Sequence, residues 1–364
     1  VGQDINNRNI DKGPVFIYKR TGDSSWVQVG SGLSGQDRSK FGSSISLSKD
    51  GTVLAIGAPN YGSGYVEIYK LENNNWVLLG NRLNGTARDL QFGKSVSLSD
   101  DGNLIAIGSP NSSTGGQLNL GTTRVFRNNN GSWVQQGQNI YGDWAHAKAG
   151  YSVSLSSDGT IVAIGSYKND GNGNDSGHVR IYKNINNTWT QVGSDIDGEA
   201  AGDYSGSSVS LSDNGTIVAI GAYLNDGNGV DSGHTRIYQY ASGSDSWSQL
   251  GGDIDGEAAG DYSGSSISLS EDGTIVAIGA YGNDANGDQS GHTSIFQYSN
   301  NSWTQLGDDI DGYAAGDYSG WSVSLSDDGK IVAIGAYGND ANGDESGHVR
   351  IYKYTNGSWT QLGY

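Results

Sequence analysis

The stretch YSVSLSSDGTIVAIG, residues 151–165, decides the fold of this chain. Its first half alternates small polar residues with apolar ones, which is typical of a strand with one packed face. The Asp-Gly pair at 158–159 predicts a tight hairpin turn, because these residues tolerate the left-handed backbone angles of such turns. The second half, IVAIG, is apolar on both faces and predicts a strand that is buried on both sides.

Two further strand patterns follow, VRIYK at 179–183 and WTQVG at 189–193. The same four patterns recur in order along the chain, so the unit has four strands. The tryptophan of the last pattern marks the period, with successive gaps of 50, 57, 56, 58, 56 and 56 residues. These tryptophans are Trp26, Trp76, Trp133, Trp189, Trp247, Trp303 and Trp359.

Repeated four-stranded antiparallel units predict an all-β fold, a β-propeller that forms a single domain over residues 1–364. We expect seven blades: a partial blade at 1–30 and full blades from about 31, 81, 138, 194, 252 and 308. The N-terminal blade lacks an inner strand. It is either incomplete, shared between the two ends of the chain, or completed by a neighbouring molecule through strand addition. A six-bladed ring with a spare hairpin is the alternative.

The composition and charge of the chain exclude some classes of binding partner. The 364 residues include 59 glycines and 3 prolines, which suits tight β-turns, and carry a formal charge of −18. This charge repels phosphate backbones, so nucleic acid is not an expected partner. No apolar run is long enough for a membrane-spanning helix, and membrane insertion is not expected. The chain has no cysteine, so the sequence gives no evidence about the redox state of its compartment.

Two segments carry a family resemblance: FGSSISLSKDGTVLAIGAP at 41–59 and FGKSVSLSDDGNLIAIGSP at 92–110. They resemble the FG-GAP repeats of the integrin α-subunit β-propeller, and the resemblance implies the same fold. In that family some hairpins between the first two strands hold calcium. The equivalent turn here, SKDGTVLA at 48–55, offers too few oxygens for an ion that takes six to eight, so that site is not expected.

Acidic loops at one end of the repeat are the candidate calcium ligands. They connect the second strand to the third, and the fourth strand to the next unit, so both sets emerge on one face. Carboxylate and amide oxygens suit calcium, yet Asp and Asn also cap turns through backbone amides, and both explanations stay open. The candidates are Asp170, Asn172, Asp175, Asp197, Asp203, Asp226, Asp231, Asp255, Asp261, Asp284, Asp288, Asp311, Asp317, Asp340 and Asp344.

Other residues on this face have weaker claims. A histidine ends each acidic loop of the later units, but one copy per blade favours packing or hydrogen bonding over a shared site. Trp144 and Trp321 lie outside the repeated tryptophan pattern and are candidate ligand-binding residues. Eight N-x-S/T sequons permit glycosylation in a secreted protein: Asn84, Asn111, Asn130, Asn174, Asn186, Asn214, Asn300 and Asn356.

Repeated, equivalent surfaces favour weak multivalent binding. We therefore expect an extracellular or cell-surface repeat module for adhesion, for binding glycans or proteins, or for structural assembly, with calcium as a candidate cofactor. Self-assembly through the incomplete N-terminal blade belongs to the same prediction. An enzyme usually needs one asymmetric set of catalytic groups, and none is evident, so the chain is not expected to be an enzyme. A polysaccharide lyase or hydrolase is the alternative.

Overall fold

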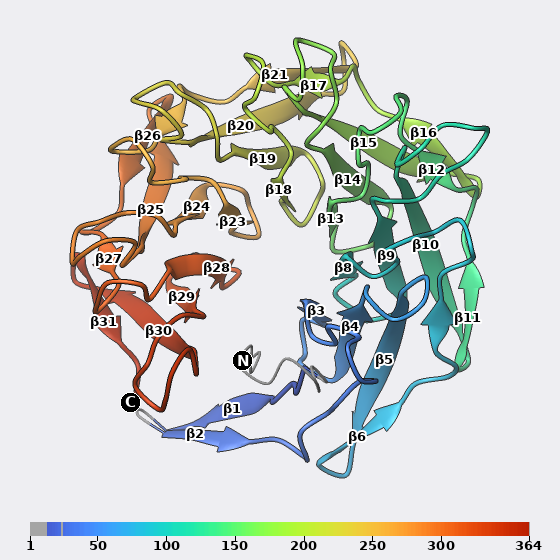
Figure 1. Ribbon diagram of the computed structural model, residues 1–364, viewed down its shortest axis with the longest axis horizontal. Helices are drawn as coiled ribbons and strands as arrows, with labels where there is room; N and C mark the ends of the chain where they lie inside the picture. The colour runs from blue at the N-terminus through green and yellow to red at the C-terminus, as the bar shows by residue number, and fades with distance from the viewer. Residues whose placement is uncertain (1–12, 23–24, 364) are drawn as a thin grey trace.

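The structure is a computed structural model of the chain and describes residues 13–22 and 25–363. Figure 1 shows its β-sheets arranged as a ring around a central axis. Six sheets contain four successive antiparallel strands each, and a two-stranded sheet lies between the last and the first of them. No helix occurs among the described residues. The described part therefore contains no helix with the length and apolar character that crossing a bilayer requires. The all-β propeller that the repeat predicts is confirmed.

Each blade runs outward from the axis in chain order. The innermost strands of the first to sixth blades are β3 (Ser44–Leu47), β8 (Ser95–Leu98), β13 (Ser152–Leu155), β18 (Ser208–Leu211), β23 (Ser266–Leu269) and β28 (Ser319–Leu325). The second strands are β4 (Val53–Ala58), β9 (Leu104–Ser109), β14 (Ile161–Ser166), β19 (Ile217–Ala222), β24 (Ile275–Ala280) and β29 (Ile331–Ala336).

The outer half of each blade is longer and more polar. The third strands are β5 (Tyr65–Glu72), β10 (Thr122–Asn129), β15 (His178–Ile185), β20 (His234–Ala241), β25 (His292–Ser299) and β30 (His348–Thr355). The fourth strands are β6 (Asn75–Leu78), β11 (Ser132–Gln135), β16 (Thr188–Gln191), β21 (Ser246–Gln249), β26 (Ser302–Gln305) and β31 (Ser358–Gln361). In the first five blades a two-residue strand pairs with the start of the third: β7 (Leu83–Asn84), β12 (Ile140–Tyr141), β17 (Ile196–Asp197), β22 (Ile254–Asp255) and β27 (Ile310–Asp311).

The blade count corrects the prediction of seven. Six blades are complete, and the remaining sheet has only β1 (Tyr18–Thr21) and β2 (Ser25–Gln28) among the described residues. These two strands match the third and fourth strands of a blade, and nothing described supplies the inner pair. Residues 1–12 of the predicted partial blade lie outside the described residues. The repeat pattern alone counts units but does not decide whether each unit has a full set of strands.

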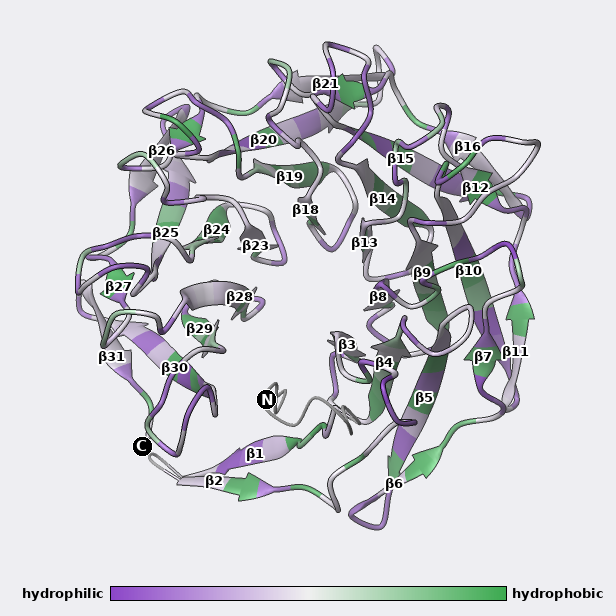
Figure 2. Cartoon of the chain, in the orientation of Figure 1, coloured by the Kyte–Doolittle hydropathy of each residue, from purple (hydrophilic) through white to green (hydrophobic). Residues whose placement is uncertain are grey.

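The second strands form the core of the ring. Every residue of β4, β9, β19 and β24 is buried, as expected for a strand that is apolar on both faces. Figure 2 shows hydrophobic residues along these strands, whereas the outer strands alternate hydrophobic and hydrophilic segments. Each core cluster draws on two neighbouring blades; one joins Ile68 of β5 to Ile107 of β9. Blade-on-blade contact therefore holds the ring together.

Serine hydroxyls link the innermost strands of neighbouring blades. At the junction of the third and fourth blades, Ser152 Oγ donates to Gly206 O at 2.8 Å. Leu211 N then donates to Ser154 Oγ at 3.0 Å. The same two hydrogen bonds recur at the other four junctions between complete blades. The Ser-x-Ser pattern therefore satisfies polar groups between blades.

The turns between the first and second strands meet around the axis on the face opposite the acidic loops. Their backbones form a chain of hydrogen bonds from Lys49 N to Asp100 O at 3.0 Å, and on through the third, fourth and fifth blades to Asp327 O. The Lys49 ammonium lies 3.0–3.5 Å from carboxylates of four blades: Asp100, Asp213, Glu271 and Asp327. We call this set the Lys49 ring.

Candidate functional site

The loops that enter each inner strand use their carboxylates to hold their own shape. Asp203 is buried, and its Oδ2 accepts hydrogen bonds from Ala200 N at 3.0 Å and from the Asn225 amide at 3.0 Å. Asp261 and Asp317 make the equivalent bonds in the next two loops. These three predicted calcium ligands therefore cap turns and join two loops.

The loops between the second and third strands are held in the same way. Asp170 Oδ1 accepts Asp175 N at 2.8 Å, and the Asn172 amide donates to Gly198 O and Glu199 O, both at 2.9 Å. Asp226, Asp284 and Asp340 repeat the first bond. None of the fifteen predicted ligands belongs to the groups of His, Asp and Glu that could hold a metal ion in the described residues. Calcium binding by the loops stays a prediction.

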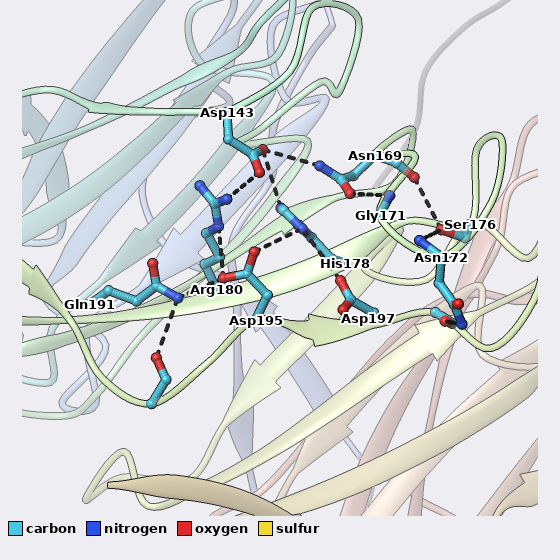
Figure 3. A network of polar contacts seen from close by, with 12 residues as sticks. Asp143, Asn169, Gly171, Asn172, Ser176, His178, Arg180, Gln191, Asp195 and Asp197 are labelled. Atoms are coloured by element: carbon cyan, nitrogen blue, oxygen red, sulfur yellow. Dashed lines mark hydrogen bonds and ion pairs between the residues drawn. The ribbon is translucent and has the colours of Figure 1, made fainter.

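Three clusters that could hold a metal form instead where a histidine opens a third strand. His178 pairs with Asp197 in the ladder between β15 and β17, and its ring is buried. Its Nδ1 lies 3.6 Å from Asp195 Oδ2, and its Nε2 lies 3.9 Å from Asp143 Oδ1 (Figure 3). The pKa of His178 is lowered by burial and by the neighbouring Arg180, so the imidazole is neutral.

Arginine neutralises the first of these clusters. Arg180 lies two residues beyond His178 on the same face of β15, and its guanidinium pairs with Asp143 and with Asp195, the latter at 3.0 Å (Figure 3). The second cluster, Glu199, His234 and Asp253, has the equivalent Arg236, whose Nη1 lies 3.3 Å from Glu199 Oε1. Burial and Arg236 lower the pKa of His234 to about 4.

The third cluster is different. Glu257, His292 and Asp309 occupy the equivalent positions, but Ser294 stands where the other two clusters have arginine. Ser294 Oγ donates to Asp309 Oδ1 at 2.6 Å. Burial and the nearby carboxylate of Asp309 raise the pKa of Glu257. This cluster therefore differs from its two copies, a difference that the sequence pattern did not reveal.

A continuous series of aromatic rings lies on the same face, where the acidic loops meet the inner strands. Neighbouring ring centroids are 4.4–6.4 Å apart, and the series extends over the third to sixth blades. The tyrosines are half-buried, so each keeps a partly accessible ring. We call this series the aromatic arc: Tyr151, Tyr167, Tyr204, Tyr223, Tyr262, Tyr281, Tyr318, Trp321 and Tyr337.

Loop geometry places these rings together. Tyr167, Tyr223, Tyr281 and Tyr337 each follow the last residue of a second strand. Tyr204, Tyr262 and Tyr318 have φ angles of 58°, 55° and 53°, which turn the loop back toward the inner strand. Burial raises the pKa of Tyr167 and of Tyr281 to about 12, so the phenols stay protonated at neutral pH.

Lysines flank one end of the arc. Lys94 Nζ lies 4.9 Å from the centroid of the Tyr151 ring, and Lys168 Nζ lies 4.9 Å from that of Tyr204. Burial and the neighbouring Lys40 lower the pKa of Lys94, and burial and Lys168 lower that of Lys148. We call these four lysines the lysine rim. One member of the rim, Lys168, is paired with Asp175 at 3.0 Å.

The two tryptophans outside the repeat pattern and the sequon asparagines differ in their exposure and contacts. Trp321 is 49% exposed and contacts Tyr281 and Tyr337 of the arc. Trp144 is 59% exposed and contacts no described aromatic ring. Seven of the sequon asparagines are exposed on the blades, and the eighth, Asn111, is half-buried and accepts a hydrogen bond from Lys148.

The comparison with protein families agrees with these repeats. The model of the FG-GAP repeat matches the chain three times, at residues 194–238, 254–296 and 311–352. The protein is a β-propeller that contains FG-GAP repeats. The resemblance drawn from its first units is thereby confirmed, with the matches falling on the fourth, fifth and sixth blades. A search of curated protein sequences finds no match to this FG-GAP propeller.

Solved structures share the fold. A protein described as a 6-phosphogluconolactonase from Bacteroides uniformis aligns with a TM-score of 0.65 and 14% identity, over 99% of this chain and 93% of its own. The periplasmic gluconolactonase of Pseudomonas aeruginosa aligns with a TM-score of 0.65 and 15% identity, over 100% and 94%. Hydrazine synthase of Kuenenia stuttgartiensis aligns with a TM-score of 0.56 and 14% identity, over 85% and 76%.

These neighbours correct one prediction. The expectation that the protein is not an enzyme, which was drawn from the lack of one asymmetric set of catalytic groups, is contradicted, because the same fold carries proteins named as enzymes. At 14–15% identity the likeness shows the fold alone and assigns no activity to this chain.

Proposed function

We propose that this propeller works outside the cell as a glycan-binding module, with the saccharide lying along the aromatic arc. The observation that carries the proposal is the arc itself, because sugar rings bind well to partly exposed aromatic faces whose polar edges also form hydrogen bonds. The tyrosine hydroxyls supply those polar edges. The arc covers four blades, so an extended oligosaccharide fits it better than a single sugar.

The lysine rim points to an acidic glycan. Lys94 Nζ lies 4.9 Å from the centroid of the Tyr151 ring, so a sugar stacked on the next rings of the arc has an ammonium group nearby, whereas Lys168 is already paired with Asp175 at 3.0 Å. A carboxylate or sulfate on that sugar would be attracted to the rim, while the rest of the chain carries a strong negative charge that repels it. The rim therefore selects both the class of ligand and its orientation.

Calorimetric titration with two oligosaccharides of equal length, one uronic acid-rich and one neutral, tests the proposal. We expect the acidic ligand to bind more tightly, with an affinity that falls as salt rises. Lys94→Ser should remove most of this preference and still fold, because the fourth and fifth blades carry serine at that position as Ser207 and Ser265. Equal affinities for both ligands would reject the acidic class, and no binding of either would reject the proposal. Cleavage of the bound oligosaccharide would assign catalysis to this face.

Self-association is a second candidate, favoured by the sector between the sixth and first blades, where the described residues supply only β1 and β2. Ile45 and Leu47 of β3 are 54% and 48% exposed, although the inner strand is otherwise an interior element. β29 alternates half-buried and buried residues, whereas β24 is fully buried. Strand addition by a second copy would cover these apolar groups. Light scattering across a concentration series tests this, with Leu47→Asn expected to keep the protein monomeric. A monomer at every concentration would contradict it.

A further inference from the structure

The Glu257, His292 and Asp309 cluster has the composition of a three-ligand metal site. His292 opens β25 and is buried, while Glu257 and Asp309 reach it from the two loops on either side of the fifth blade. One ligand atom from each residue lies within 4.8 Å of the others. An imidazole nitrogen and two carboxylate oxygens form the kind of set that zinc takes at open sites, with water as the fourth ligand.

Comparison within the chain shows why this cluster, and not its copies, is available to an ion. In the other two clusters an arginine already supplies the positive charge, through the pairs of Arg180 with Asp143 and Asp195 and of Arg236 with Glu199. Ser294 brings no charge. The Glu257 carboxylate forms no hydrogen bond or ion pair within the described residues, so both carboxylates lack a cation.

Neighbouring groups orient the ligands. Ser294 Oγ and Gln305 Nε2 both donate to Asp309 Oδ1, at 2.6 and 2.7 Å, which leaves Oδ2 free to bind. Ser294 Oγ also lies 3.4 Å from His292 Nε2, so this serine contacts two ligands at once. Such contacts behind the ligands fix their direction and raise affinity.

We propose that Glu257, His292 and Asp309 bind one divalent transition-metal ion of the zinc class. Calcium is a poor fit, because it takes six to eight oxygen ligands and this cluster offers a nitrogen. Tetrahedral zinc places its ligand atoms about 3.3 Å apart, so the three groups must move closer. Glu257 lies exposed on its loop, and its side chain has the freedom to do so.

Metal titration of chelator-treated protein without a polyhistidine tag tests the proposal. Zinc is measured by calorimetry, and cobalt by the visible absorption of a tetrahedral ion. We expect wild type to bind one ion per chain. His292→Ala should abolish binding, and Glu257→Gln should weaken it at least about tenfold. Melting temperatures measured without metal confirm that each variant is folded.

Ser294→Arg is the decisive variant, because it restores the His-x-Arg pattern of the neighbouring blades and should fold as they do. Its guanidinium would neutralise Asp309 and Glu257, so we expect loss of the ion with the fold intact. The reciprocal variant, Arg236→Ser, should bind a second ion at Glu199, His234 and Asp253. Absence of binding by wild type would overturn the proposal. Unchanged binding by Ser294→Arg and His292→Ala would place any bound ion elsewhere and overturn it equally.

Discussion

Trp189 shows how a single residue of the repeat serves two blades. Its indole N–H donates to Gln136 O of the preceding blade at 2.9 Å. Each of the seven repeated tryptophans makes an equivalent bond, and that of Trp26 to Leu362 O, at 3.2 Å, links the two ends of the ring. The sequence reveals the tryptophan period. It does not reveal the bond, because donor and acceptor are about one whole unit apart and neither has a local signal.

Tyrosine ionisation is the first prediction at this scale. The pKa values of Tyr167 and Tyr281 rise to about 12 on burial, from 10.0. The folded state therefore keeps protons that the unfolded state loses, and this stability is present below pH 10 and lost as pH rises toward 12. Absorbance titration at alkaline pH should show these phenols ionising late, with unfolding. Replacing Tyr167 or Tyr281 with Phe should reduce the fraction of tyrosines that ionise only at this high pH. If all tyrosines ionised near pH 10, the burial of these two rings would be contradicted.

The second prediction at the scale of the residue concerns the substitution Lys49→Gln. It leaves the four carboxylates of the Lys49 ring without their ammonium, and should lower the melting temperature at pH 7 by about 2–4 °C. Burial raises the pKa of Asp213 in the folded state, so its protonated form favours folding as pH falls. The difference in melting temperature between wild type and Lys49→Gln, measured by thermal unfolding, should therefore be smaller at pH 4 than at pH 7. A difference that is equal at both values would show that the ring charges do not interact.

At the scale of the element, the strands were predictable to within one or two residues, because alternation and Asp-Gly turns are local signals. The pattern predicted a strand at 151–156, and β13 covers Ser152–Leu155. The short strands such as β17 were not predicted, since two residues carry no periodicity. Loop residues were predictable as acidic but not as a site. Their carboxylates prove to bond to nearby N–H groups, and the sequence alone did not separate that role from metal binding.

Glycine at the end of a second strand gives the prediction for this scale. A Cβ on Gly221 would lie 2.0 Å from Gly264 O of the next blade, a backbone atom that has no room to move. Gly221→Ala should therefore destabilise the protein by at least about 2 kcal/mol in denaturant unfolding. Gly335→Ala is the control, because among described residues its Cβ would meet only the mobile Ser322 Oγ at close range. Equal losses of stability in Gly221→Ala and Gly335→Ala would contradict the close contact between Gly221 and the next blade.

At the scale of the whole molecule, the repeat predicted the ring of blades and its acidic face. It did not predict the aromatic arc or the one cluster without arginine on that face. The unique features come from single departures: Ser294 replaces an arginine, and Lys94, Tyr151 and Trp321 occupy positions that hold serine in other blades. Only the closed ring brings the aromatic residues of four blades into one series. Trp321 and Trp144 are equally distinct from the repeat in the sequence, and of the two the structure places Trp321 in the arc.

The most direct test of the glycan-binding account is calorimetric titration of an acidic oligosaccharide into wild type, Trp321→Ser and Trp144→Ser. Serine is the native residue at the Trp321 position in the fourth and fifth blades, so folding should be preserved. The account predicts that Trp321→Ser weakens binding about tenfold or more, because a stacking face is lost. Trp144→Ser should bind as wild type does. Equal affinities in all three proteins would contradict binding along the aromatic arc.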